Sequence, residues 1–256
     1  MFLVKTPITK YCVVASLVVF TGCASLEPYI RDINIISVPQ EKEIGNQFEA
    51  EIAKEMTIVQ DSIINNRIDA IGKKLLQGFL RRDFDYRFHV VEDKTPNAFT
   101  IPGGIVYVHT GLINSAGDDS ELAGVLGHEL GHAYKRHPAK GMTREFGIDY
   151  LTKLLFKDPS TQGQLKTITL SLAKGGILSK YSRQDEYEAD EIGYLLVKKT
   201  GYSTSGLLRF LRKIMILEQQ TGRSVPFLAS HPPTPDRIAR LESFERSSPS
   251  ESILNG

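Results

Sequence analysis

The HELGH motif at residues 128–132, set within the apolar run 122–133, constrains this chain more than any other feature. Residues four apart on an α-helix lie on one face, so a helix here places the imidazoles of His128 and His132 side by side. Two such imidazoles hold one metal ion, and the carboxylate of Glu129 reaches a water next to it. The motif therefore predicts a hydrolytic zinc site with Glu129 as general base, if the rest of the chain supplies a third ligand.

The best candidate for the third ligand lies on a second helix, because a catalytic zinc takes three protein ligands and leaves one position to water. Within the expected helix 182–199, Glu186 and Asp190 are four residues apart and share a face. Glu186 is predicted to bind the metal, and Asp190 to accept a hydrogen bond from the far nitrogen of a ligand histidine. By spacing alone Glu188 competes for the ligand role, and a solvated acidic face is the alternative for the whole segment.

Residues 40–246 are predicted to form one domain of the α+β class that is mainly helical. Apolar positions recur every four residues over 39–56 and 60–80, which is typical of amphipathic helices. Aromatic and β-branched residues alternate over 84–92, and two short strands flank the Pro-Gly-Gly turn at 102–104. These patterns predict a small sheet of three to four strands beside the active-site helix. Further helices are expected over 118–136, 141–157, 162–178, 182–199, 203–219 and 235–246, with a Pro-rich loop over 228–235.

The two ends of the chain are predicted to lie outside this domain. Residues 1–22 combine two lysines with a ten-residue apolar run, which is typical of a signal peptide and too short to span a bilayer. The segment 20–23, Phe-Thr-Gly-Cys, resembles a bacterial lipobox, so Cys23 is expected to carry a lipid; a plain signal peptide or a short anchor is the alternative. Residues 23–39 are then a tether, and the Ser/Pro/Glu-rich residues 247–256 a disordered tail.

Cysteine and charge content narrow the class of protein. The two cysteines, Cys12 and Cys23, both precede the predicted domain, so no disulfide framework is expected in it. With 31 basic and 30 acidic residues the net charge is +1, and no basic stripe is visible in the sequence. We therefore expect no nucleic-acid partner.

Four motifs together resemble the HtpX-like and CAAX-prenyl-protease-type zinc metallopeptidases, which are gluzincins, and most closely the periplasmic lipoprotein members from bacteria. They are the HELGH motif, the acidic segment 182–190, the segment 97–108 and the Ser-His-Pro-Pro segment 230–238. The resemblance covers residues 40–245 and implies a zincin-like fold with one zinc ion per chain. It also implies that the two motif histidines and Glu186 bind zinc and that the motif glutamate is the base. We expect neither the membrane helices of the HtpX branch nor the tetratricopeptide extension of some relatives.

The resemblance also implies a regulatory residue, a substrate and a location. In periplasmic relatives the matching histidine is implicated in autoinhibition, so His231 is expected to be a fourth zinc ligand that displaces the water; a loop histidine capping the last helix is the alternative. The strand at Asn97, Ala98 and Phe99 is expected to be an exposed edge that binds substrate as an added strand. The expected substrates are unfolded or misassembled envelope proteins. The expected location is the periplasmic side of the envelope, lipid-anchored in the outer membrane because no Asp follows Cys23.

The remaining polar candidates are given structural roles. Arg237 is expected to pair with Asp190 or Asp236 rather than to stabilise an oxyanion. As an alternative function, the chain is a non-proteolytic chaperone or assembly lipoprotein that keeps a structural zinc. Three further histidines are expected to be strand or surface residues: His89, His109 and His137.

Overall fold

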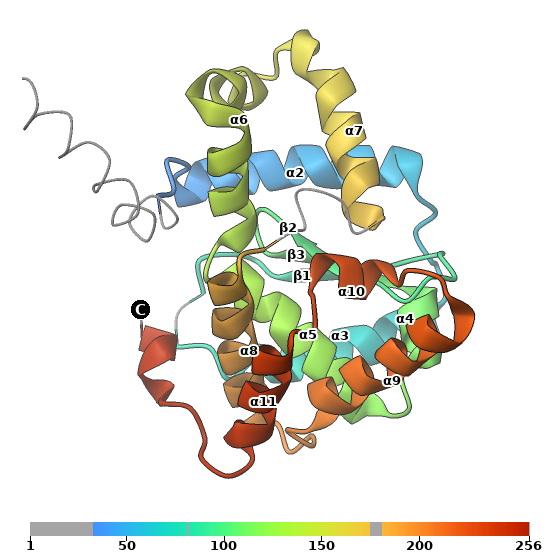
Figure 1. Ribbon diagram of the computed structural model, residues 1–256. Coiled ribbons are helices and arrows are strands. Elements are labelled where there is room, and N and C mark those ends of the chain that lie inside the picture. The colour runs from blue at the N-terminus through green and yellow to red at the C-terminus, as the bar shows by residue number, and fades with distance from the viewer. Residues whose placement is uncertain (1–32, 81, 175–180, 256) are drawn as a thin grey trace, which may run out of the picture.

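A computed structural model describes residues 33–80, 82–174 and 181–255 (Figure 1). The predicted signal peptide, the predicted lipidation site Cys23 and most of the predicted tether lie outside the described residues. The predicted class, mainly helical with a small sheet, is confirmed. The elements in order are α2 (Val38–Glu55), α3 (Ser62–Leu76), β1 (Arg87–Val91), β2 (Ala98–Ile101), β3 (Ile105–His109), α4 (Thr110–Ser115), α5 (Asp119–Tyr134), α6 (His137–Leu155), η1 (Pro159–Thr161), α7 (Gln162–Ala173), α8 (Arg183–Lys198), α9 (Gly206–Thr221), α10 (Pro226–Ser230), α11 (Pro235–Phe244) and η3 (Glu251–Asn255).

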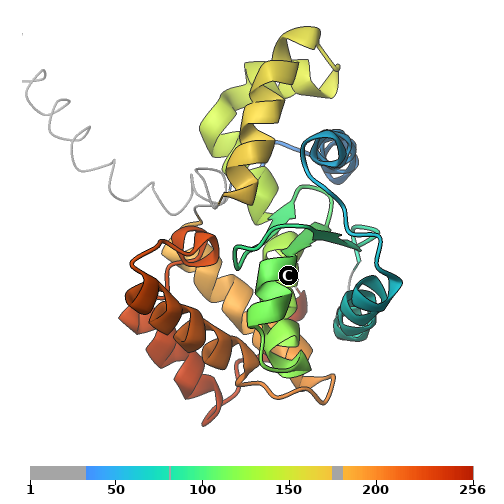
Figure 2. The same ribbon diagram turned by 90° about the vertical axis from the view of Figure 1, so that its right-hand side faces the viewer.

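The sheet has three strands in the order β1-β3-β2, with β1 parallel and β2 antiparallel to β3. The predicted hairpin joins β2 to β3, and its turn contains Gly103 and Gly104 with φ angles of 85° and 80°. Glycine adopts such left-handed angles without a steric cost, which explains the Gly-Gly sequence. Figure 2 shows α5 and α2 on opposite faces of this sheet. Because β3 is central, β2 is an edge strand. It packs against α5.

Two hydrophobic clusters cover the two faces of the sheet. Ala98, Val106 and Val108 pack in a cluster that also contains the apolar residues of α5, α8 and α9. Phe99 and Tyr107 point the other way, into a second cluster built on α2 and the α6–α7 segment. This alternation is the period-2 pattern of a strand, so successive residues of β2 belong to different layers.

Helices α5 and α8 approach so closely that their backbones touch, and this contact places the functional residues. A Cβ atom at Gly131 would lie 2.6 Å from the carbonyl oxygen of Ala189, and one at Gly127 would lie 3.0 Å from that of Gly193. Side chains at those positions would push the helices apart. Gly131 within the motif and Gly127 just before it therefore allow the motif to pack directly against the acidic helix α8.

Four short elements were not predicted, namely α4, η1, α10 and η3, and the prediction of a disordered C-terminal tail is wrong. The helices α4 and α10 are too short to show a helical period in the sequence. The expected disordered tail instead contains η3, whose Leu254 is fully buried and accepts a hydrogen bond from the hydroxyl of Tyr134 through its backbone carbonyl. Two adjacent apolar residues in a polar tail, Ile253 and Leu254, give no periodic signal, yet both pack against the core. No helix in the described ranges combines the length and apolarity needed to cross a membrane.

Candidate active site

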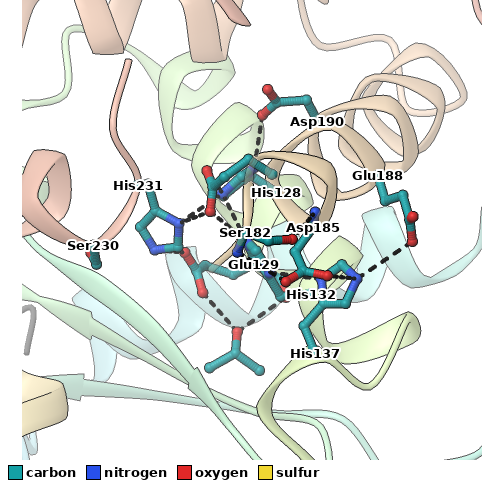
Figure 3. Close-up of polar contacts among 12 residues, drawn as sticks. His128, Glu129, His132, His137, Ser182, Asp185, Glu188, Asp190, Ser230 and His231 are labelled. Atoms are coloured by element: carbon teal, nitrogen blue, oxygen red, sulfur yellow. Dashed lines mark hydrogen bonds and ion pairs between the residues drawn. The ribbon is translucent and has the colours of Figure 1, made fainter. Parts of the chain in front are cut away.

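Four side chains from three parts of the chain converge in one buried cluster. Figure 3 labels the three histidines among them. The ligand atoms of the four side chains all lie within 4.8 Å of one another, and each side chain is at most 3% exposed. They come from α5, from the first turn of α8 and from the residue after α10. The cluster, called the metal group below, consists of His128, His132, Glu186 and His231.

The nitrogen atoms of the metal group face one another at distances that suit a shared cation. Nε2 of His128 lies 3.1 Å from Nε2 of His132 and 3.1 Å from Nδ1 of His231, which itself lies 3.0 Å from Oε1 of Glu186. Several imidazole nitrogens meeting a carboxylate cannot all be satisfied by protons, whereas one tetrahedral metal ion satisfies all of them. Imidazole and carboxylate ligands in this number fit zinc, and the structure therefore brings the predicted ligand residues together.

Asp190 lies behind His128, on the side away from the metal group. Its Oδ1 is 2.9 Å from Nδ1 of His128, which leaves Nε2 of that ring for the metal. Arg237 donates two hydrogen bonds to the same carboxylate, at 2.7 and 2.9 Å. Burial alone would raise the pKa of Asp190, but Arg237 and His128 hold it below its usual range. The carboxylate is therefore ionised and sets the tautomer of the ligand imidazole.

Arg237 connects this network to Glu186 and to the segment that carries His231. It is 1% exposed, its Nη1 lies 2.6 Å from Oε2 of Glu186, and it donates a hydrogen bond to the carbonyl of His231. Burial would raise the pKa of Glu186, but Arg237 and His231 lower it well below its usual range. Of the two carboxylates predicted to pair with Arg237, the structure places Asp190 against it. A buried cation thus keeps the carboxylate of Glu186 anionic.

His231 contacts both carboxylates of the site. Its Nδ1 faces Glu186, and its Nε2 lies 3.4 Å from Oε1 of Glu129. Burial lowers the pKa of this imidazole, but Glu186 and Glu129 outweigh that effect and raise it. His231 therefore lies between the metal ligand Glu186 and the motif glutamate Glu129.

His137 was predicted to be a strand or surface residue, and this prediction is wrong. It is fully buried as the first residue of α6, and its Nδ1 lies 2.9 Å from Nδ1 of His132. Its Nε2 lies 3.5 Å from Asp185 and 3.5 Å from Glu188. Burial lowers the pKa of His137 despite these carboxylates, so the neutral ring accepts the proton of His132 and donates its own towards them. This contact also places Glu188 outside the metal group.

Replacing His137 with Phe is expected to weaken zinc binding about 10- to 100-fold, because the far nitrogen of His132 then loses the partner that orients it. Competition with a fluorescent chelator measures this zinc affinity independently of any activity. His89→Phe is the matched control, since His89 lies in β1 against Glu49 and away from the metal group. A zinc affinity for His137→Phe within twofold of the parent would show that His137 only fills space.

The predicted substrate edge is an edge strand, but it is not exposed. Asn97, Ala98 and Phe99 are all at most 2% exposed. The backbone N–H of Phe227 in α10 donates a hydrogen bond to the carbonyl of Pro96, and α7 also lies against β2. The strand is therefore covered by α7 and α10, which are distant from it in the sequence. The sequence of the strand itself could not indicate that these helices cover it.

The other two histidines lie in strands, as predicted. His89 is in β1, and His109 ends β3, where it is fully buried near Asp93. Thr100 was not predicted as a site residue, yet it donates a hydrogen bond to the carboxylate of Glu129 at 2.7 Å. One signal was present, since Thr100 is a hydroxyl residue at a position of the strand whose neighbours on the same face are apolar.

Comparisons with known proteins agree with this geometry. The profile of peptidase family M48 matches residues 62–245. The mitochondrial metalloendopeptidase OMA1 of Schizosaccharomyces pombe is 31% identical over 177 residues, which are 69% of this chain and 52% of that protein. The beta-barrel assembly-enhancing protease of Escherichia coli K12 is 26% identical over 212 residues, 80% of this chain and 43% of that protein. The metalloprotease YcaL of E. coli K12 is 32% identical over 202 residues, 78% of each chain. This chain thus spans about half the length of the first two relatives.

Proposed function

This chain belongs to peptidase family M48, and on that premise we propose that it is a zinc metalloendopeptidase that hydrolyses peptide bonds with Glu129 as general base. The observation that carries the proposal is the buried metal group built around the HELGH motif, with the carboxylate of Glu129 turned towards it. Zinc is the metal of M48 peptidases, and the donor set of the metal group fits one zinc ion per chain.

The residues of the site divide the chemistry among them. His128, His132 and Glu186 would hold the metal, which when bound would acidify a water and polarise the scissile carbonyl. Oε1 of Glu129 has no hydrogen-bond partner among the described residues, so it is free to take the proton of the attacking water. Glu129 then passes this proton to the leaving amine.

The arrangement of His231 supports a resting state that is closed. A zinc site with four protein ligands has no position left for water and is inactive. His231 is in the metal group, and α10, which precedes it, also touches the segment before the substrate edge. We infer that the segment around α10 and His231 must move away before a peptide can bind along β2.

The sequence and one relative support a proposal for the substrate class and the location. One relative is named a beta-barrel assembly-enhancing protease, and the segment at residues 20–23 resembles a lipobox. We infer that the substrates are unfolded or misassembled envelope proteins and that a lipid on Cys23 anchors the chain at the periplasmic face of the outer membrane. The mass of the N-terminal peptide, from protein purified out of bacterial membranes, tests the lipid.

Removal of the metal tests the proposed activity. Dialysis against EDTA is expected to abolish cleavage of casein, and one equivalent of zinc per chain is expected to restore it. Magnesium should not replace zinc, because imidazole ligands favour zinc over a hard cation that prefers oxygen. Cleavage that persists in the metal-free protein would contradict a metallopeptidase.

A further inference from the structure

Thr100 lies in the middle of β2 with its side chain turned towards α5, and it is 1% exposed. Its hydroxyl oxygen is 2.7 Å from Oε2 of Glu129 and 3.0 Å from the carbonyl oxygen of the same residue. Ala98, the neighbouring residue on this face of the strand, is part of the apolar core. Most buried hydroxyls in proteins have a hydrogen-bond partner, and the partner of Thr100 is the motif glutamate.

The hydroxyl of Thr100 carries a single proton, which it donates to one acceptor at a time. An ionised carboxylate accepts a shorter and stronger hydrogen bond than a neutral carbonyl does. The carbonyl of Glu129 is also inside α5, where helical carbonyls already accept the N–H four residues on. The shorter of the two contacts is the one to the carboxylate. The proton of Thr100 therefore goes to Oε2 of Glu129.

Holding one carboxylate oxygen determines what the other oxygen faces. Oε1 of Glu129 is buried, has no hydrogen-bond partner among the described residues and lies 3.4 Å from Nε2 of His231. It therefore points at the metal group, where the attacking water must give up its proton. The terminal torsion of a glutamate side chain has a broad energy profile, so without this hydrogen bond the carboxylate would be free to turn away.

We propose that Thr100 is a positioning residue for hydrolysis, whose hydroxyl holds Oε2 of Glu129 so that Oε1 stays aimed at the attacking water. This inference rests on the proposed function and deepens it. Thr100 also pairs with Val106 of β3, on the strand whose other edge is proposed to bind the peptide. The strand that aligns the substrate thereby aligns the base, because both depend on the same backbone.

Thr100→Val tests this role, because valine keeps the branched shape and the strand propensity but removes the hydroxyl. With fluorescein-labelled casein and the full chain loaded with zinc, kcat is expected to fall about ten- to hundredfold, the loss typical of one hydrogen bond to a charged group. KM and the zinc affinity, measured by chelator competition, are expected to stay within twofold. Thr100→Ser, which restores the hydroxyl, is expected to recover most of kcat.

The matched control is Thr169→Val, because Thr169 on α7 is also fully buried but its hydroxyl has no partner among the described residues. This control is expected to retain the parental kcat. Thr100→Ala replaces the valine variant if that variant does not fold, and the same fall in kcat is expected.

Three outcomes overturn the inference: parental kcat in Thr100→Val, no recovery in Thr100→Ser, or a loss of zinc affinity that accounts for the lost activity. Each of these leaves the proposed function standing as long as Glu129→Gln is inactive. An active Glu129→Gln would instead contradict the proposed function itself, so the two failures are distinguishable.

Discussion

Replacing Glu129 with Gln is expected to abolish casein hydrolysis while the zinc stays bound. The amide has nearly the shape of the carboxylate but cannot accept the proton of the attacking water. Loss of a general base lowers kcat by about 100- to 10,000-fold, which corresponds to about 3 to 5 kcal/mol of transition-state stabilisation. Initial rates on labelled casein, at equal protein and zinc content, measure the effect.

The control for this experiment is Glu145→Gln, an exposed glutamate on α6 that is expected to keep the parental rate. Zinc content by elemental analysis should be one ion per chain in the parent and in both variants. If Glu129→Gln cleaves casein as fast as the parent, the base is another group. If neither the parent nor His231→Ala, which opens the site, cleaves casein while both retain zinc, the alternative of an assembly lipoprotein with a structural zinc is supported.

Much of the site could be predicted because two helical spacings encode it. His128 and His132 are one turn apart on α5, and Glu186 and Asp190 are one turn apart on α8, so each pair shares a face. The two pairs are brought together because small residues let α5 pack closely against α8. In the sequence this contact appears only as small residues, Gly127 and Gly131 on α5 and Ala189 and Gly193 on α8.

The parts of the site that could not be predicted depend on contacts between distant segments. His137 is five residues beyond His132, which is not a spacing that shares a helical face; a left-handed residue, Arg136, turns the chain between them. Thr100 meets Glu129 only because β2 packs on α5. Arg237 reaches Asp190 from a separate helix. No local period records such contacts, so the sequence shows the residues but not their partners.

The fold likewise has parts that could be predicted from local sequence patterns and parts that could not. Long amphipathic helices and the Gly-Gly hairpin were predicted because their patterns repeat or because only glycine suits the turn. The helices that cover β2 and the burial of the C-terminal residues were not predicted, since each depends on contacts with residues distant in the sequence. Leu254 is the simplest case, because its carbonyl and side chain both have partners on a core that the local sequence does not describe.

Replacing His231 with Ala is expected to raise the rate of casein hydrolysis about ten- to hundredfold. His231 contacts the carboxylates of Glu186 and Glu129, and a hydrogen bond to a charged group stabilises a state by about 1.5 to 3 kcal/mol. Removing it shifts the balance from the closed to the open site by the corresponding factor. Initial rates at saturating zinc measure the change, with His89→Ala as the control that should leave the rate unaltered.

The zinc affinity of His231→Ala is expected to move in the opposite direction from its rate. Loss of one candidate ligand weakens the hold on the metal, whereas loss of a group that blocks the water position speeds hydrolysis. A residue that takes part in the reaction would show a lower rate on substitution, and a remote loop histidine would change neither quantity. A histidine that closes the site therefore predicts a variant with a higher rate and a lower zinc affinity. A slower His231→Ala at full zinc occupancy would contradict autoinhibition and would place His231 in the catalytic machinery.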